Sequence, residues 1–113
     1  MAQTPPLGEF EVLVLLAVLH LAERDQPAFG STILGEIHAR VTRPVARGAI
    51  YVTLDRLEEK GLLASRLGAA TRIRDNRPKR LFKATPAGLR AARQAVDLVN
   101  RMQKGLEPAL GIQ

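Results

Sequence analysis

The side chains of this sequence that could do chemistry are mainly arginines and lysines. From Arg40 to Lys83 there are twelve Lys/Arg and four Asp/Glu, a balance of +8. The rest of the chain holds five basic and seven acidic residues, a balance of −2, within a net charge of +6. Guanidinium and ammonium groups bind phosphate oxygens, and arginine also pairs with the edge of guanine. Positive charge confined to one segment is typical of a nucleic-acid-binding surface. The alternative is an ordinary solvated basic surface.

Residues for catalysis or metal binding do not occur in a useful pattern. The chain has no cysteine, and His20 and His38 have no metal-ligand spacing with acids. Glu58 and Glu59 are neighbours, and neighbouring side chains on a helix point about 100° apart, so the two cannot share one substrate. We expect His20 to pack or cap a helix end and His38 to be exposed. No enzyme activity, metal or cofactor is expected.

A helix is predicted to begin at Pro44 or Val45, after a turn at residues 42–44, and to end at Gly61. Gly61 suits the left-handed residue that commonly ends a helix. One apolar stripe recurs at i, i+4 and i+7, formed by Ile50, Leu54 and Leu57. This helix would hold the first basic residues of the central segment on a rigid support.

The charges of this helix run against its dipole. Arg43 and Arg47 lie at the amino end, and Asp55, Glu58 and Glu59 lie towards the carboxyl end. The dipole favours the reverse order by roughly 0.3–1 kcal/mol per charge. We therefore expect the basic amino end to bind something outside the protein, and a polyanion is the simplest candidate.

The remaining pattern predicts a mainly α chain with one small β-hairpin. Further helices are expected at Gly8 to about Glu23, Gly30–Val41 and Thr85–Gly111. The hairpin is expected to have a strand Leu62–Leu67, a turn Gly68–Asn76 and a return strand Lys79–Ala84. Ser31 or Thr32 can cap the second helix, and Thr85 followed by Pro86 fits the start of the last one.

The predicted hairpin is strongly basic. Against the single acid Asp75 it carries Arg66, Arg72, Arg74, Arg77, Lys79, Arg80 and Lys83. Arginines on a two-stranded loop can enter a minor groove or hold phosphates. An ordinary solvated hairpin is the alternative.

Two stretches resemble the PadR family of winged-helix transcriptional regulators. The family's recognition helix typically reads Gly-x-Ile-Tyr-x-x-Leu-x-x-Leu-Glu-x-x-Gly-Leu, matched here by Gly48, Ile50, Tyr51, Leu54, Leu57, Glu58, Gly61 and Leu62. Residues Arg77 to Gly88 resemble the second wing strand and the start of the last helix. Val52 stands where the family usually has proline. The resemblance implies a winged helix-turn-helix DNA-binding regulator, and specifically a repressor.

The charge pattern and the resemblance together select a candidate DNA-binding set: Arg43, Arg47, Gly48, Tyr51, Arg72, Arg74, Arg77 and Lys79. Arg47 is the best candidate for a base contact, because arginine pairs bidentately with guanine. Tyr51 matches the family's tyrosine, whose role is a phosphate contact. A half-buried aromatic that closes the corner between helix and hairpin is the alternative for Tyr51.

A homodimer is expected from two helices. The first is apolar nearly all round between Val12 and Leu19, and such a helix must be covered on every side. We expect this chain to cover one side only. In the last helix Leu89, Ala92, Val96, Val99 and Leu106 have a rough 3–4 spacing, like a short coiled-coil seam. Packing within the same chain is the alternative, while the resemblance implies dimerisation. The expected interface residues are Leu13, Leu16, Leu89, Val96, Val99 and Leu106.

The predicted organisation has three parts, in a cytoplasmic protein without an evident signal peptide. A flexible segment (1–7) precedes a winged helix-turn-helix domain (8–84), and a dimerisation helix follows (85–113). The expected partner is double-stranded DNA with a pseudo-palindromic operator, and a module that binds an acidic protein is the alternative. A small-molecule effector of unknown identity is another candidate partner. Some relatives stack flat ligands on tryptophan, but this chain has no Trp.

Overall fold

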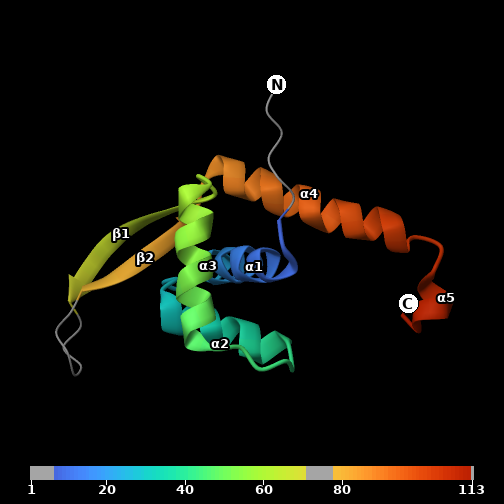
Figure 1. Cartoon of the computed structure of the whole chain (residues 1–113), viewed down its shortest axis with the longest axis horizontal. Helices are drawn as coiled ribbons and strands as arrows, with labels where there is room; N and C mark the ends of the chain where they lie inside the picture. Colours follow the sequence, from blue (N-terminus) through green and yellow to red (C-terminus); the bar gives the residue numbers. More distant parts are fainter. Residues whose placement is uncertain (1–6, 71–77, 113) are drawn as a thin grey trace.

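The computed structural model describes residues 7–70 and 78–112. In this part of the chain the elements are, in order, α1 (Glu9–Glu23), α2 (Gly30–Arg40), α3 (Arg47–Glu59), β1 (Leu63–Ala70), β2 (Pro78–Ala84), α4 (Pro86–Gln103) and α5 (Glu107–Leu110). Helix α1 lies at the centre, with α2, α3 and α4 around it and the hairpin to one side (Figure 1). The predicted mainly helical fold with one small hairpin is confirmed.

The apolar core forms where α1 contacts α2, α3, α4 and β2. Its fully buried side chains are Val14, Leu15, Val18, Ile33, Ile50, Leu54, Leu57 and Leu63. On the opposite side of α1, Val12, Leu16 and Leu19 are only half-exposed. The chain therefore covers one side of α1 completely and the other side only in part.

The start of α3 and the cap of α2 differ from the predictions. Helix α3 begins at Arg47, because Val45 packs against the core from the preceding turn and Ala46 is still extended, with φ −79° and ψ 143°. Helix α2 begins at Gly30, as predicted, but its N-cap is Phe29, two or three residues before the predicted caps Ser31 and Thr32. The Thr32 hydroxyl accepts a hydrogen bond from the Phe29 N–H at 2.9 Å and donates one to the Pro27 carbonyl at 2.8 Å. Thr32 thus stabilises the start of α2 from its third position.

The hairpin is longer than predicted and is hydrogen-bonded to the segment before α2. Strand β1 continues to Ala70, with an irregular register between Leu67 and Ala70. Gly68 permits this, because a Cβ there would lie 2.8 Å from Leu81 Cδ1 on the opposite strand. On the other edge of β2, the Phe82 N–H donates to the Ala28 carbonyl at 2.8 Å. The segment before α2 therefore fixes the hairpin to the helices.

Helix α4 starts as predicted but ends early. The Thr85 hydroxyl accepts from the Gly88 N–H at 3.0 Å and donates to the Gly61 carbonyl at 2.7 Å. The helix stops at Gln103, because Gly105 takes a left-handed φ of 91°. The prediction of one helix from Thr85 to Gly111 was therefore wrong, and Leu106 lies in the connection to α5.

A buried carboxylate joins α1 to α2. Glu36 accepts hydrogen bonds from Arg24, just after α1, and from Arg40 Nε at 2.7 Å. Glu36 is 7% exposed, whereas both arginines are about half-exposed. The hydrogen bond from Arg24, with that from Arg40, lowers the pKa of Glu36 from its ordinary 4.5 to about 2. This carboxylate is thus charged at neutral pH and fixes the angle between α1 and α2.

Candidate nucleic-acid interface

The predicted binding elements lie on one side of the molecule. The amino end of α3 is close to α2, and the hairpin strands extend down the same side (Figure 1). Arg43, Arg47, Gly48 and Tyr51 are all exposed there. The structure therefore brings these four predicted residues together at the α2–α3 turn and the first turns of α3. Arg72, Arg74 and Arg77 lie outside the described residues.

The orientation of α3 follows from its buried stripe. Ile50, Thr53, Leu54 and Leu57 face the core. At about 100° per residue, the opposite side of the helix is the side of Gly48, Val52 and Glu59. Arg47 and Tyr51 lie beside this outward side. A groove of duplex DNA could therefore receive the outward side of α3 without disturbing the core.

Arg43 and Arg47 differ in their surroundings. Arg43 Nη1 lies 3.0 Å from Glu9 Oε1, and both side chains are more than half-exposed. Such a surface pair is worth about 0–1 kcal/mol, so a phosphate could replace Glu9 at small cost. Arg47 forms no salt bridge with any residue of the described chain. Arg47 is consequently the freer of the two cations at this end of α3.

Tyr51 lies over the start of α2. A Cβ added to Gly30 would come within 2.4 Å of the Tyr51 hydroxyl, so the phenol rests on the bare backbone of that glycine. Tyr51 remains 46% exposed, and its hydroxyl has no hydrogen-bond partner among the described residues. The tyrosine is therefore placed between α3 and α2, away from the helix–hairpin corner, with its hydroxyl available to an external group.

The hairpin sorts its cations onto two faces. The register pairs Arg66 with Leu81 and Ala64 with Lys83, and directly opposed residues project to the same face. Strand alternation adds Lys79 to this outer face, where its ammonium lies 5.0 Å from the Phe29 ring centre. Arg66, Lys79 and Lys83 form no salt bridge within the described residues. The outer face thus supplies unneutralised positive charge.

Arg80 lies on the inner face, where it forms salt bridges that the sequence did not predict. Its guanidinium contacts Asp55 Oδ1 at 2.9 Å and also Glu58, both on α3. Ser65 of β1 donates to Glu58 Oε2 at 2.7 Å. The hydrogen bond from Ser65 and that from Arg80 lower the pKa of Glu58. The acids near the carboxyl end of α3, which oppose the dipole, therefore attach the hairpin to α3.

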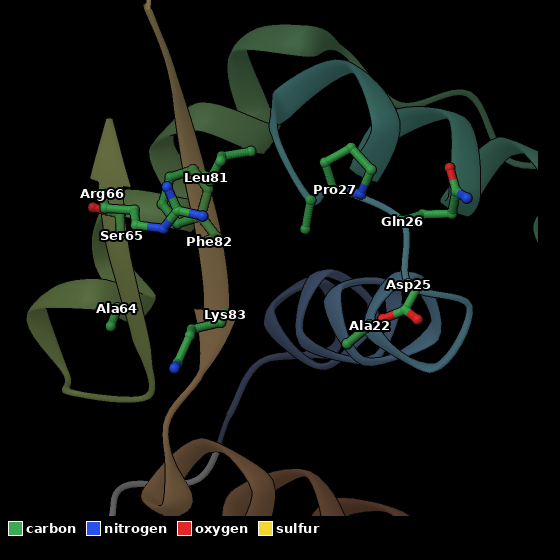
Figure 2. A pocket seen from close by; sticks show the side chains of 11 residues that line it. Ala22, Asp25, Gln26, Pro27, Ala64, Ser65, Arg66, Leu81, Phe82 and Lys83 are labelled. Atoms are coloured by element: carbon green, nitrogen blue, oxygen red, sulfur yellow. The ribbon is translucent and has the colours of Figure 1, made fainter. Parts of the chain in front are cut away.

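A cleft of about 660 Å³ opens between the outer face of the hairpin and the α1–α2 connection. Figure 2 shows Arg66 and Lys83 on the hairpin side and Asp25, Gln26 and Pro27 on the other. The volume suits a small molecule. The cleft lies near the base of the hairpin, apart from the amino end of α3.

Most of the predicted dimer residues lie on the surface of this chain. Leu89, Val96, Val99 and Leu106 are exposed, whereas Leu13 and Leu16 are half-buried. Helix α4 buries Gly88, Ala91 and Ala92 against its own chain. The same stripe continues in the second half of α4 through Val99, Leu98 and Met102, which are 62%, 64% and 74% exposed. Leu98 and Met102 lie on this stripe but outside the 3–4 spacing that begins at Leu89, so that spacing did not indicate them.

Within the described part of the chain, no helix is long and apolar enough to cross a membrane. The same residues hold no cluster of three or more His, Asp or Glu side chains that could bind a metal.

A short helix pair followed by a basic hairpin, α2–α3–β1–β2, defines the winged helix-turn-helix class of proteins, and this chain has that architecture. Residues 18–94 match the transcriptional regulator PadR-like family. The chain therefore belongs to the PadR family of transcriptional regulators and is not an enzyme.

Known relatives agree with this assignment. Transcriptional regulator Rv3488 of Mycobacterium tuberculosis is 42% identical over 83 residues, which are 73% of this chain and 72% of that protein. A PadR family regulator from Eggerthella lenta has a similar structure, with 27% identity and a TM-score of 0.66 over 90% of this chain and 86% of the other. A PadR family regulator from Clostridium difficile shares the fold, with 16% identity and a TM-score of 0.67 over 91% and 98%.

Proposed function

We propose that this chain represses transcription by binding a pseudo-palindromic operator in double-stranded DNA as a homodimer. The observation that carries the proposal is the exposed, basic amino end of α3 beside a hairpin whose outer face bears unneutralised cations. Residues 8–84 are the DNA-binding domain in this proposal, and residues 85–113 form the dimerisation segment.

The amino end of α3 enters a major groove in the proposed complex. Recognition helices of this class present their first residues to base edges. Arg47 is free to pair with a guanine, and Gly48 lets the backbone approach the DNA closely. The Tyr51 hydroxyl lies at the start of α2 without a hydrogen-bond partner among the described residues, and it is suited to a phosphate. Arg43 and the hairpin cations Arg72, Arg74, Arg77 and Lys79 complete the proposed grip on the backbone.

The dimer in this proposal buries the second half of α4. Leu98, Val99 and Met102 continue a stripe that the chain's own core covers only in its first half. A second copy offers the same stripe, so a two-fold arrangement covers both at once. Leu89, Val96 and Leu106 flank it, and the half-buried Leu13 and Leu16 of α1 add apolar surface. Two copies related in this way present two α3 helices to a palindrome.

The test is selection of bound duplexes from a random pool, followed by titration of the selected operator across salt concentrations. If the dimer neutralises about six to ten phosphates, log K should fall with log salt at a slope of roughly −5 to −9. The selected sequence should contain two inverted half-sites about one helical turn apart, or a multiple of it. A pool with no enriched sequence and no salt dependence would favour the alternative, an acidic protein partner.

Two further measurements test the role of Arg47 and the assignment as a repressor. Arg47→Ala should relax preference at one position of each half-site, since an arginine–guanine pair is worth about 1–3 kcal/mol of discrimination. Transcription in vitro from a promoter that overlaps the selected operator should fall when the protein is added. A rise in transcription would reject the repressor assignment, which rests on family resemblance, and would leave DNA binding intact.

A further inference from the structure

One apolar side chain on α3 does not serve the core. Ile50, Leu54 and Leu57 are fully buried, whereas Val52 is 56% exposed. Val52 lies about 200° around the helix from Ile50, so it projects outward. Its location in the second turn places it among the α3 residues that face the proposed groove.

Valine at this position contributes little to the fold, because more than half of its surface is exposed. A β-branched residue has a lower helix propensity than alanine, lysine or glutamate, and an exposed one buries little surface in return. A single exposed apolar residue is common on any surface. The location of Val52 is what makes it informative.

The neighbours of Val52 suit a close approach to DNA. Gly48 lies one turn earlier, and a Cβ on Gly48 would meet no atom of the described residues within 4 Å. Arg47 and Tyr51 are exposed beside it. Valine can neither donate nor accept a hydrogen bond. In a major groove, the feature of the base edges that an apolar side chain contacts favourably is the C5-methyl group of thymine.

We infer that Val52 selects a T·A base pair in each half-site by contact with the thymine methyl group. The inference rests on the proposed DNA-binding function and adds a specificity determinant to it. Arg47 would read a guanine through hydrogen bonds, and Val52 would read a thymine through apolar contact.

The test replaces thymines of the selected operator with deoxyuridine, one symmetric pair of positions at a time. Deoxyuridine lacks only the methyl group. At one position per half-site we expect about a fourfold loss of affinity per thymine, because burying a methyl group is worth about 0.8 kcal/mol. Val52→Ala should bind the thymine and deoxyuridine operators equally at that position. Val52→Ile, which keeps an apolar tip, should restore the preference.

The outcomes separate this inference from the proposed function. Val52→Ala should fold normally, since alanine is the better helix former; circular dichroism checks this. If the wild type binds its operator but no thymine position is sensitive to deoxyuridine, the inference fails alone. It also fails alone if Val52→Ala keeps the full deoxyuridine penalty. If the wild type selects no sequence, the proposed function and the inference fail together.

Discussion

Gly48 and Gly35 both lie in helices, and both have room for a larger side chain. A Cβ on either would meet no described atom within 4 Å. Gly48 lies at the second position of α3, on the side proposed to face DNA, and Gly35 lies in the middle of α2. Substitutions at these two glycines therefore distinguish the effect of glycine on helix stability from its effect on operator affinity.

Gly48→Ala should raise the free energy of unfolding by about 0.5 kcal/mol, because alanine loses less backbone entropy in a helix. The same change should weaken operator binding by roughly tenfold, since a methyl group would stand between the α3 backbone and the base edges; one tenfold step corresponds to about 1.4 kcal/mol. Urea unfolding and fluorescence anisotropy measure the two effects.

Gly35→Ala is the matched control and should stabilise α2 by about 0.5–1 kcal/mol without any effect on operator affinity. Equal affinities for the wild type and Gly48→Ala would show that the DNA does not approach the backbone at this residue.

At the residue scale, the apolar spacing of the sequence correctly predicted which side chains of α3 are buried. Ile50, Leu54 and Leu57 are buried as their spacing indicated, and Gly61 ends its helix with a φ of 75°. The partners of Arg80 could not be predicted, because its face depends on the hairpin register. A shift of one residue would have placed Arg80 outside and Leu81 inside.

At the scale of elements, Arg80 attaches the hairpin to α3. Its guanidinium contacts Asp55 and Glu58 and also lies 4.9 Å from the Phe82 ring centre. Arg80→Met should lower the free energy of unfolding by about 0.5–1 kcal/mol, a discounted figure because the pairs are partly exposed. The hairpin should become less firmly oriented, so operator affinity should fall. Urea unfolding and anisotropy titrations measure both.

The salt dependence distinguishes attachment from phosphate contact. Arg80 is already neutralised by two acids, so Arg80→Met should leave the slope of log K against log salt unchanged. Loss of a direct phosphate contact would reduce the slope by about 1. Arg66→Met is the matched control, because Arg66 has no salt bridge within the described residues. The free energy of unfolding of this variant should match that of the wild type. A reduced slope for Arg80→Met would show that Arg80 contacts DNA.

The α1–α2 connection should respond to acid. The pKa of Glu36 is lowered from 4.5 to about 2, so its ion pairs stabilise the folded chain above about pH 4.5. This contribution is lost progressively as the pH falls from about 4.5 to 2. Glu36→Gln should therefore have a lower Tm than the wild type at pH 7, with the difference narrowing below pH 4.5. Thermal scans from pH 7 to 2.5 measure this difference in Tm. A difference that stays constant over this range would show that the charge of Glu36 does not stabilise the fold.

The elements themselves were easier to predict than their ends. Apolar periodicity located α2 and α3 because each has a buried stripe, and α1 was located by its nearly continuous apolar run. The early end of α4 was missed, because Gly105 follows a seam whose exposed residues gave no sign of where the helix stops. The start of α3 was displaced because Val45, read as helical, packs against the core from the turn.

For the whole molecule, the second half of α4 determines the expected oligomeric state. Val99→Glu would place a charge in the middle of the exposed stripe. An unpaired buried charge costs several kcal/mol, so the dimer dissociation constant should rise by at least about 100-fold. Sedimentation velocity at micromolar concentration measures this.

Gln94→Glu adds the same charge on the polar side of α4 and should leave association unchanged. A wild type that sediments as a monomer, or equal effects of the two changes, would contradict the proposed interface.

The junction between α3 and α4 has a consequence for the operators such a protein can use. Thr85 and Gly88 join α4 directly to Gly61 and Leu62, and a Cβ on Gly88 would lie 2.0 Å from the Leu62 carbonyl oxygen. These contacts hold the start of α4 close to the end of α3. In a dimer, a small rotation where the α4 helices cross would become a larger displacement of the two α3 helices. Substitutions at the crossing could retune the gap between half-sites while the residues that read the bases stay the same.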